Sequence, residues 1–261
     1  LPNLDAYCET CASVGMVYWN QRMNQFTGDS KYIDVLERSM YNGALAGVSL
    51  AGDRFFYVNP LESNGDHHRQ AWYGCACCPS QISRFLPSIG NYIYGTSDKA
   101  LWVNLFIGNT TEVTIDGKKV VMKQETDYPW DGLVKLTVTS EQPLGKELRI
   151  RIPGWCKSYT LSVNGNKVDS TTDKGYTVIK EWKTGDLIVL NMDMPVEKVS
   201  ADPRVRQNTG KRALQRGPLV YCLEETDNAK DFADLALTPT SSFEVKDEPD
   251  NLGGIRSIKA I

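Results

Sequence analysis

Leu101-Trp102-Val103-Asn104-Leu105-Phe106-Ile107 is the stretch at which the pattern of this sequence changes. It is short and mostly apolar, so it predicts a β-strand. The chain after it consists of short apolar or alternating runs, separated by turn signals such as Asp116-Gly117, Asn164-Gly165-Asn166 and Thr184-Gly185-Asp186. Regularly spaced short strands of this kind predict a β-sandwich. Further strands are expected at residues 112–115, 119–123, 133–138, 148–152, 160–163, 177–179, 187–190 and 214–221.

The first 95 residues have a different pattern, because apolar residues recur there at helical spacing. The first predicted helix covers about residues 10–25 and ends at Gly28, a residue type that commonly stops helices. A second helix begins near Asp29-Ser30. A third opens with Pro79 at its first position, where proline is well tolerated. Pro87 lies inside this third pattern and should kink or shorten the helix.

The apolar pattern of the second helix extends to Leu50. A long connection, Ala51 to Cys78, then leads to the third helix. It contains Phe55-Phe56-Tyr57 and a polar run from Glu62 to Gln70. Connections of this length in a compact domain are usually functional or disordered.

These patterns divide the chain into a helical region at residues 1–95, a β-sandwich at 96–199, and a second, short or partial β-rich domain at 200–261. The predicted fold class is therefore α+β multidomain. Three helices bury their apolar faces poorly on their own, so residues 1–95 are interpreted as the C-terminal part of a larger helical barrel or bundle. The first residue is Leu1 rather than methionine, which indicates a chain entered partway through a longer protein.

Composition and charge exclude several classes of protein. The 261 residues include 29 basic and 32 acidic side chains, for a net charge of −3. Without a basic stripe, no nucleic acid is expected as a partner. Without a run of about 18 apolar residues, no membrane span is expected. Seven cysteines in a chain of this length do not fit a disulfide-stapled secreted domain, which is usually smaller and richer in cysteine.

Five of the seven cysteines form two tight clusters, in Tyr7-Cys8-Glu9-Thr10-Cys11 and in Gly74-Cys75-Ala76-Cys77-Cys78-Pro79. Thiolates together with a carboxylate are ligands that suit a tetrahedral zinc site. Glu9 and Cys11 are two residues apart and would not face each other on a continuous helix, so we place them where the chain enters the first helix. The adjacent cysteines precede Pro79 and the start of the third helix, where the helix dipole favours thiolate.

Spacing alone leaves two ligand sets open. One is Glu9, Cys11, Cys77 and Cys78. The other is a purely structural zinc site formed by Cys8, Cys11, Cys75 and one of the adjacent pair. Structural sites are common, so spacing by itself favours the second set.

Several motifs resemble glycoside hydrolase family 127, the β-L-arabinofuranosidase-like enzymes, and the resemblance runs through nearly the whole chain. The ordered pair of E-x-C and C-C-P motifs is its most specific part. The residues that carry the resemblance are Ala6-Tyr7-Cys8-Glu9-Thr10-Cys11-Ala12, Leu36-Glu37-Arg38, Tyr41-Asn42-Gly43-Ala44-Leu45-Ala46-Gly47, Phe56-Tyr57-Val58-Asn59-Pro60-Leu61, Cys77-Cys78-Pro79, Arg151-Ile152-Pro153-Gly154-Trp155 and Arg216-Gly217-Pro218-Leu219-Val220-Tyr221.

The resemblance implies the C-terminal helices of an (α/α)6 barrel followed by β-sandwich domains. It also implies a catalytic Zn²⁺ held by Glu9, Cys11, Cys77 and Cys78. Cys77 would be the nucleophile of a retaining glycoside hydrolase that acts on β-L-arabinofuranosides or related sugars. The thiolate would attack the anomeric carbon, and water would then release the sugar with its configuration retained.

Glu37 and Tyr57 fall at positions that border the sugar pocket in the family, so the resemblance implies substrate binding by both. The alternative interpretations are an ion-paired helix carboxylate for Glu37 and loop packing for Tyr57. The general acid/base glutamate of the family lies shortly before the Y-C-E-T-C motif and would precede Leu1. We therefore expect residues 1–261 alone to be inactive.

A rival function, from a different class, is a zinc-stabilised module that binds carbohydrate or serves a structural role without catalysis. The expected partner is an oligosaccharide or glycoconjugate substrate, and a homodimer is left open. A reducing cytoplasm would suit free thiols, whereas a zinc-protected site would also survive in a periplasm.

Overall fold

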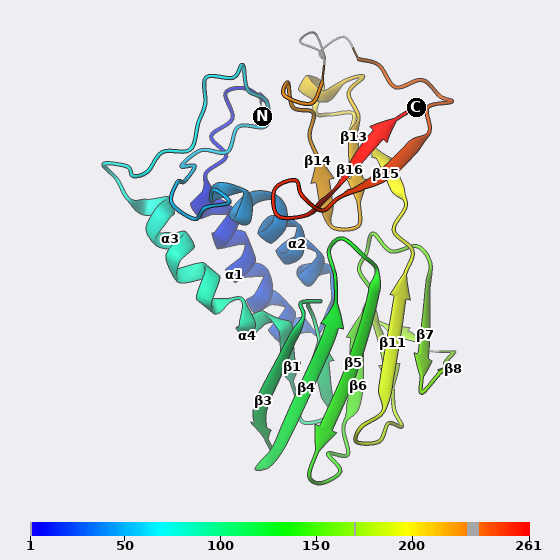
Figure 1. Ribbon diagram of the computed structural model, residues 1–261. Helices are drawn as coiled ribbons and strands as arrows, with labels where there is room; N and C mark the ends of the chain where they lie inside the picture. The colour runs from blue at the N-terminus through cyan, green and yellow to red at the C-terminus, as the bar shows by residue number, and fades with distance from the viewer. Residues whose placement is uncertain (1, 170, 229–234) are drawn as a thin grey trace.

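The computed structural model describes residues 2–169, 171–228 and 235–261. A helical region comes first, two packed sheets follow, and two smaller sheets end the chain (Figure 1). This is the predicted order of helices before sheets. The boundaries proposed at residues 95 and 199 stay predictions. The helices are α1 (Thr10–Thr27), α2 (Lys31–Ser39), α3 (Cys77–Phe85) and the single turn α4 (Gly90–Ile93).

The first helix, α1, ends as predicted at Gly28. This residue has a φ of 62°, and its N–H donates to the carbonyl of Asn24 at 2.7 Å. Glycine adopts this left-handed conformation without a steric penalty, so the helix stops there.

A search of the described residues for a helix that could span a membrane finds none.

The second and third helices differ in detail from the prediction. α2 ends at Ser39 and continues as a π-helical turn, Met40–Ala44, and a 3₁₀ turn, Leu45–Gly47. α3 begins at Cys77, so Pro79 is its third residue, where its missing N–H would lack an intrahelical partner in any case. Pro87 lies in a separate 3₁₀ turn, Leu86–Ser88, and this agrees with the predicted shortening of α3.

The helices share one apolar core, which packs α1 and α2 against α3 and α4. Its buried members are Val14, Val17, Ile33, Leu36, Met40, Ala44, Phe85, Tyr92, Ile93 and Leu105.

Two sheets pack face to face as the predicted β-sandwich. The five-stranded sheet has the order β1-β2-β6-β10-β9, in which only the β2–β6 pair is parallel. Its strands are β1 (Tyr94–Thr96), β2 (Ala100–Val103), β6 (Glu147–Arg151), β9 (Thr172–Asp173) and β10 (Tyr176–Ile179). The six-stranded sheet has the order β3-β4-β5-β11-β7-β8 and is antiparallel throughout. Its strands are β3 (Asn109–Ile115), β4 (Lys118–Thr126), β5 (Leu133–Ser140), β7 (Tyr159–Val163), β8 (Asn166–Lys167) and β11 (Leu187–Met192).

Inward-facing side chains of both sheets form a single core, as expected where strands alternate between buried and exposed residues. The turn predicted at Asp116-Gly117 joins β3 to β4, with φ values of 51° and 74°. Positive φ at both positions is typical of a tight hairpin turn.

The strand predicted at residues 101–107 is shorter than expected, because β2 ends at Val103. The N–H groups of Asn104 and Leu105 both donate to the carbonyl of Ile93, at 2.8 and 3.3 Å, instead of to a neighbouring strand. The chain turns here, so that Leu105 enters the helical core and Phe106 enters the sandwich core. This short segment therefore joins the two hydrophobic cores.

The last region contains a three-stranded sheet and a two-stranded hairpin. The single strand predicted at 214–221 is wrong, because β13 (Ala213–Arg216) and β14 (Leu219–Tyr221) form a hairpin around Gly217-Pro218. Gly217 has a φ of 57°, and proline has no N–H for a ladder, so a continuous strand cannot pass through this pair. The remaining strands are β12 (Val196–Val199), β15 (Phe243–Glu248) and β16 (Ile255–Ala260).

A fully buried cation connects the helices to the sandwich. Arg151, at the end of β6, donates to Asp34 of α2 at 2.8 Å and also to the carboxylate of Glu37 on the same helix. The hydroxyl of Tyr128 donates to the same Glu37 oxygen at 2.8 Å. These contacts fix α2 against the sandwich.

Candidate metal centre

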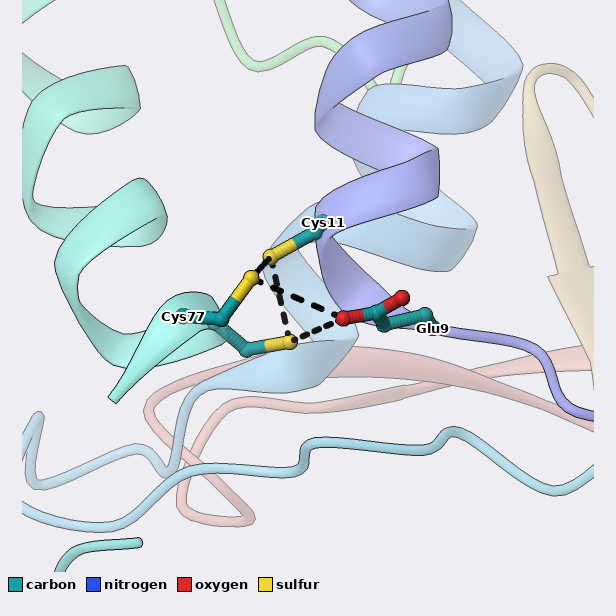
Figure 2. A group of neighbouring side chains, drawn as sticks. Glu9, Cys11 and Cys77 are labelled. Atoms are coloured by element: carbon teal, nitrogen blue, oxygen red, sulfur yellow. Dashed lines mark hydrogen bonds between the residues drawn. The ribbon is translucent and has the colours of Figure 1, made fainter. Parts of the chain in front are cut away.

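Two helix starts bring four metal-ligating side chains together. Glu9 and Cys11 lie at the start of α1, and Cys77 and Cys78 are the first two residues of α3 (Figure 2). One ligand atom from each of these residues lies within 4.8 Å of every other. Glu9 has an extended backbone (φ −72°, ψ 134°) directly before the helix, and this lets its side chain converge with that of Cys11.

The distances within this cluster are short. The Sγ atom of Cys11 lies 2.8 Å from Sγ of Cys77 and 3.2 Å from Sγ of Cys78. Oε1 of Glu9 lies 3.6 Å from the Sγ atoms of both Cys77 and Cys78. Cys78 is buried, Glu9 and Cys11 are half-buried, and Cys77 is exposed. Cys77 is therefore the thiol of the cluster that an external molecule reaches most easily.

The surroundings of the cluster make its thiols hard to ionise. Burial raises the pKa of Cys11 well above its usual range, and the neighbouring thiols Cys77 and Cys78 raise it further. Burial likewise raises the pKa of Cys78. Thiols of this kind stay protonated at neutral pH unless a positive charge stabilises the thiolates. Three sulfurs and one carboxylate oxygen fit the tetrahedral coordination of a zinc ion.

An irregular segment, residues 55–59, contacts both halves of the cluster. Glu9 pairs with Val58 in an isolated antiparallel bridge, and the N–H of Thr10 donates to the carbonyl of Tyr57 at 3.0 Å. The same carbonyl lies 3.6 Å from Sγ of Cys78. This segment belongs to the long connection in the sequence, so part of that connection has a defined place beside the site.

The alternative four-cysteine set is not assembled in this structure. Cys8 and Cys75 do not belong to the group of ligand atoms formed by the described residues. Cys75 is exposed instead, with its Sγ 4.0 Å from the hydroxyl of Tyr57. Each of the seven cysteines, all within the described residues, is a free thiol.

Tyr57 lies beside the cluster and is half-buried. Contacts with Cys75 and then with Glu9 raise the pKa of its hydroxyl, so the phenol stays protonated and can donate a hydrogen bond. Its ring packs edge-on against Tyr73 at 5.5 Å and lies 6.4 Å from Tyr7. The substrate-binding role of Tyr57 stays a prediction.

Glu37 occupies a different environment from the other predicted site residues. It is 1% exposed, and both partners of its Oε1 atom, Arg151 and Tyr128, come from the sandwich. It also lines a cavity of about 220 Å³ together with Asp34, Arg38, Gly154, Trp155 and Pro218. The placement of Glu37 favours a structural ion pair, and its substrate-binding role stays a prediction. No local pattern in the sequence pointed to a partner 114 residues away.

Comparisons with known proteins agree with this architecture. Residues 1–91 match the model of the β-L-arabinofuranosidase GH127 catalytic domain. Residues 100–194 match the GH127 middle domain, and residues 196–260 match the glycoside hydrolase family 127 C-terminal domain. The helical region with its thiol cluster, followed by sheets, thus has the domain order of glycoside hydrolase family 127.

Individual relatives give the same result. The non-reducing end β-L-arabinofuranosidase of Bifidobacterium longum subsp. longum is 38% identical over 280 residues, covering 99% of this chain and 42% of that protein. The crystal structure of a GH127 β-L-arabinofuranosidase from Geobacillus stearothermophilus T6 has a TM-score of 0.94 at 47% identity, covering 99% of this chain and 43% of that one. Another GH127 β-arabinofuranosidase structure has a TM-score of 0.96 at 44% identity, covering 100% of this chain and 44% of that one.

The chain belongs to glycoside hydrolase family 127. It spans about two fifths of the length of these relatives.

Proposed function

We propose that the protein, at its full length, is a retaining glycoside hydrolase that acts on β-L-arabinofuranosides or related sugars. Cys77 is the proposed nucleophile, and Glu9, Cys11, Cys77 and Cys78 hold a Zn²⁺ ion. The observation that carries this proposal is the convergence of these four ligand atoms within 4.8 Å, with Cys77 alone exposed among them. The named activities of the relatives support the choice of sugar.

In the proposed reaction, the ionised Sγ of Cys77 attacks the anomeric carbon of the sugar. The bond from that carbon to the leaving oxygen breaks, a general acid protonates this oxygen, and a glycosyl thioether forms on Cys77. Water, deprotonated by the same group acting as base, then displaces the sulfur and regenerates the thiolate with net retention of configuration. When bound, the zinc ion supplies the positive charge that keeps the thiols ionised at neutral pH.

Burial divides the roles within this ligand set. Cys78 is 0% exposed and is therefore a ligand rather than a nucleophile, because an incoming sugar cannot reach its sulfur. Cys11 is half-buried and contacts both of the other thiols. Tyr57, whose protonated hydroxyl lies 4.0 Å from the exposed Cys75, is proposed to donate a hydrogen bond to a sugar that approaches Cys77.

We do not assign the general acid/base of the proposed reaction to any residue of this chain. By the pattern of the family it precedes the Y-C-E-T-C motif. The expectation that residues 1–261 alone are inactive therefore remains a prediction. An assay of this chain beside the full-length protein, with the zinc content of both measured, would check it. Hydrolysis by the isolated chain would show that a carboxylate within it serves as the acid.

The test of the proposed function uses the full-length protein and its Cys77→Ser variant, with Cys156→Ser as the control, because Cys156 lies in the sandwich outside the cluster. We expect Cys77→Ser to lower kcat on an aryl β-L-arabinofuranoside by at least about 10³-fold and Cys156→Ser to leave it unchanged. Elemental analysis measures the zinc content. A haloacetamide derivative of the sugar should label Cys77, and labelling of Cys11 or Cys75 instead would contradict the proposed nucleophile.

A further inference from the structure

Asn59 connects its own segment to two other parts of the chain beside the metal cluster. Its backbone N–H donates to the carbonyl of Cys8 at 2.8 Å. Its side-chain Nδ2 lies 2.6 Å from Oγ1 of Thr10 and 3.4 Å from the carbonyl of Gly43 in the π-helical turn. Cys8 and Thr10 flank Glu9, so one residue of the 55–59 segment holds the chain on both sides of a ligand.

The hydrogen-bond partners define how the amide of Asn59 is oriented. The carbonyl of Gly43 accepts only, so the amide nitrogen must face it. The hydroxyl of Thr10 donates its hydrogen to the carbonyl of Phe56 at 3.0 Å, and its oxygen is therefore free to accept from Asn59. The hydroxyl of Thr10 thus donates one hydrogen bond and accepts another. A side chain at position 59 that can only accept hydrogen bonds would lose the contact with Thr10.

Thr10 has little freedom to move. It is 0% exposed, and its N–H donates to the carbonyl of Tyr57. The backbone of Gly47 packs so closely against it that a Cβ on Gly47 would lie 2.5 Å from Cγ2 of Thr10. Because Thr10 stands between Glu9 and Cys11, the position of its backbone determines where both ligand side chains begin.

We infer that Asn59 is a positioning residue for the metal centre and acts through Thr10. The bond from Asn59 to Thr10 holds the Glu9 and Cys11 ligands at the 55–59 segment, whose Tyr57 carbonyl also contacts Cys78. The 55–59 segment therefore contacts the ligand-bearing starts of both α1 and α3. This inference rests on the proposed function, because it assigns Asn59 a role toward the zinc ion proposed there. Partners that orient the ligands of a metal commonly change its affinity by 10- to 100-fold when they are removed.

The test compares zinc affinity in full-length variants. Asn59→Ala removes the amide, Thr10→Val removes the hydroxyl at nearly constant shape, and Thr10→Ser restores a hydroxyl. Asn42→Ala is the matched control. The side chain of Asn42 makes three hydrogen bonds, with Arg38, Pro218 and Val220 at 2.8–2.9 Å, but none with the ligand segments. Competition with a chromophoric chelator measures the Kd for zinc, and the visible spectrum of the cobalt(II)-substituted protein reports thiolate ligation and tetrahedral geometry.

We expect Asn59→Ala and Thr10→Val each to weaken zinc binding about 10- to 100-fold and to alter the cobalt spectrum. Thr10→Ser and Asn42→Ala should stay within about 3-fold of wild type. The double variant Asn59→Ala/Thr10→Val should lose less than the sum of the two single losses, because both substitutions remove the bond between Asn59 and Thr10. Thr10→Val tests the inference by itself if Asn59→Ala does not fold.

Three results would overturn the inference. In the first, both Asn59→Ala and Thr10→Val keep the Kd for zinc and the cobalt spectrum of wild type. In the second, Asn42→Ala loses as much zinc affinity as Asn59→Ala does. In the third, the loss in the double variant equals the sum of the two single losses. If the wild-type protein itself bound no zinc, the proposed function would fall together with the inference. Normal zinc binding by wild type and by the Asn59 and Thr10 variants would overturn the inference alone.

Discussion

The sulfur of Cys11 lies 2.8 Å from the sulfur of Cys77, although 66 positions of sequence separate the two residues. One thiol comes from the start of α1 and the other from the start of α3. A sulfur–sulfur bond is about 2.05 Å long, so only a small movement separates this pair from a disulfide. A metal ion bound by both sulfurs would hold them as thiolates and keep them from oxidation.

Removal of the metal therefore predicts a specific oxidation. When the full-length protein is stripped by a chelator and treated with diamide, we expect one disulfide between Cys11 and Cys77, while diamide takes up the two electrons and two protons. Peptide mapping by mass spectrometry under non-reducing conditions checks this pairing. The zinc-loaded protein should resist the same treatment.

Cys222 serves as the internal control for that experiment, because it is exposed and does not belong to the cluster. Its modification should be independent of zinc. A disulfide that joins Cys8 to Cys75 instead would contradict the observed grouping of the thiols.

Arg151 provides a prediction about stability. Arg151→Met would leave the carboxylate of Glu37, whose side chain is 2% exposed, without its buried cation. Breaking one partner of a buried ion pair costs about 3–5 kcal/mol, so we expect a loss of that size in the free energy of unfolding. Urea denaturation of the full-length protein measures it. The double variant Arg151→Met/Glu37→Gln should recover part of the loss, because no buried charge on Glu37 then remains unpaired.

Arg149 is a matched control for this prediction. It lies two residues earlier on the same strand and pairs with Glu147 and Asp173 at 3.0 and 2.8 Å, where it is partly exposed to solvent. Arg149→Met should lower the free energy of unfolding by no more than about 1 kcal/mol.

The kinetics and stability of Glu37→Gln separate the two roles considered for Glu37. A higher KM at unchanged stability would support contact with the sugar, whereas lower stability at unchanged KM would support the structural ion pair.

The sequence predicted those features that depend on neighbouring residues. Gly28 marks the end of α1 and Asp116-Gly117 marks a hairpin turn, because each requires a positive φ that few residue types adopt. The two cysteine clusters were visible as motifs, and their position at helix starts followed from Pro79 and the apolar periodicity. The order of helices and sheets could be predicted for the same reason, since the period of the apolar pattern changes near residue 95.

Features that depend on distant partners could not be predicted in this way. β2 ends at Val103 because the carbonyl of Ile93 accepts the next two N–H groups, and no local signal encodes that contact. The ion pair between Glu37 and Arg151 and the bond between Asn59 and Thr10 span 114 and 49 positions. Asn59 was seen only as part of a motif, because an asparagine in a loop is also typical of an ordinary turn.

Tyr176 provides a prediction about alkaline pH. It is 0% exposed, and its hydroxyl accepts from Nδ2 of Asn24 at 2.9 Å and donates to Oδ1 of Asn104 at 2.8 Å. Burial raises the pKa of this hydroxyl from 10.0 to about 12. A raised pKa in the folded state means that the folded protein holds its proton more tightly than the unfolded chain does. The resulting stabilisation is fully present below pH 10 and is lost as the pH rises through about 12.

The change that tests this is Tyr176→Phe, which removes the titrating hydroxyl and keeps the ring. Wild type should be the more stable protein at pH 8, because Asn24 and Asn104 lose their shared partner in the variant. The difference in unfolding free energy should then shrink by up to about 2–3 kcal/mol as the pH rises from 10 towards 12, since two pKa units correspond to that amount. Denaturation curves of both proteins, measured in parallel at each pH, cancel the titration of all other groups. A difference that stays constant or widens above pH 10 would show that the hydroxyl of Tyr176 is not buried in the folded protein.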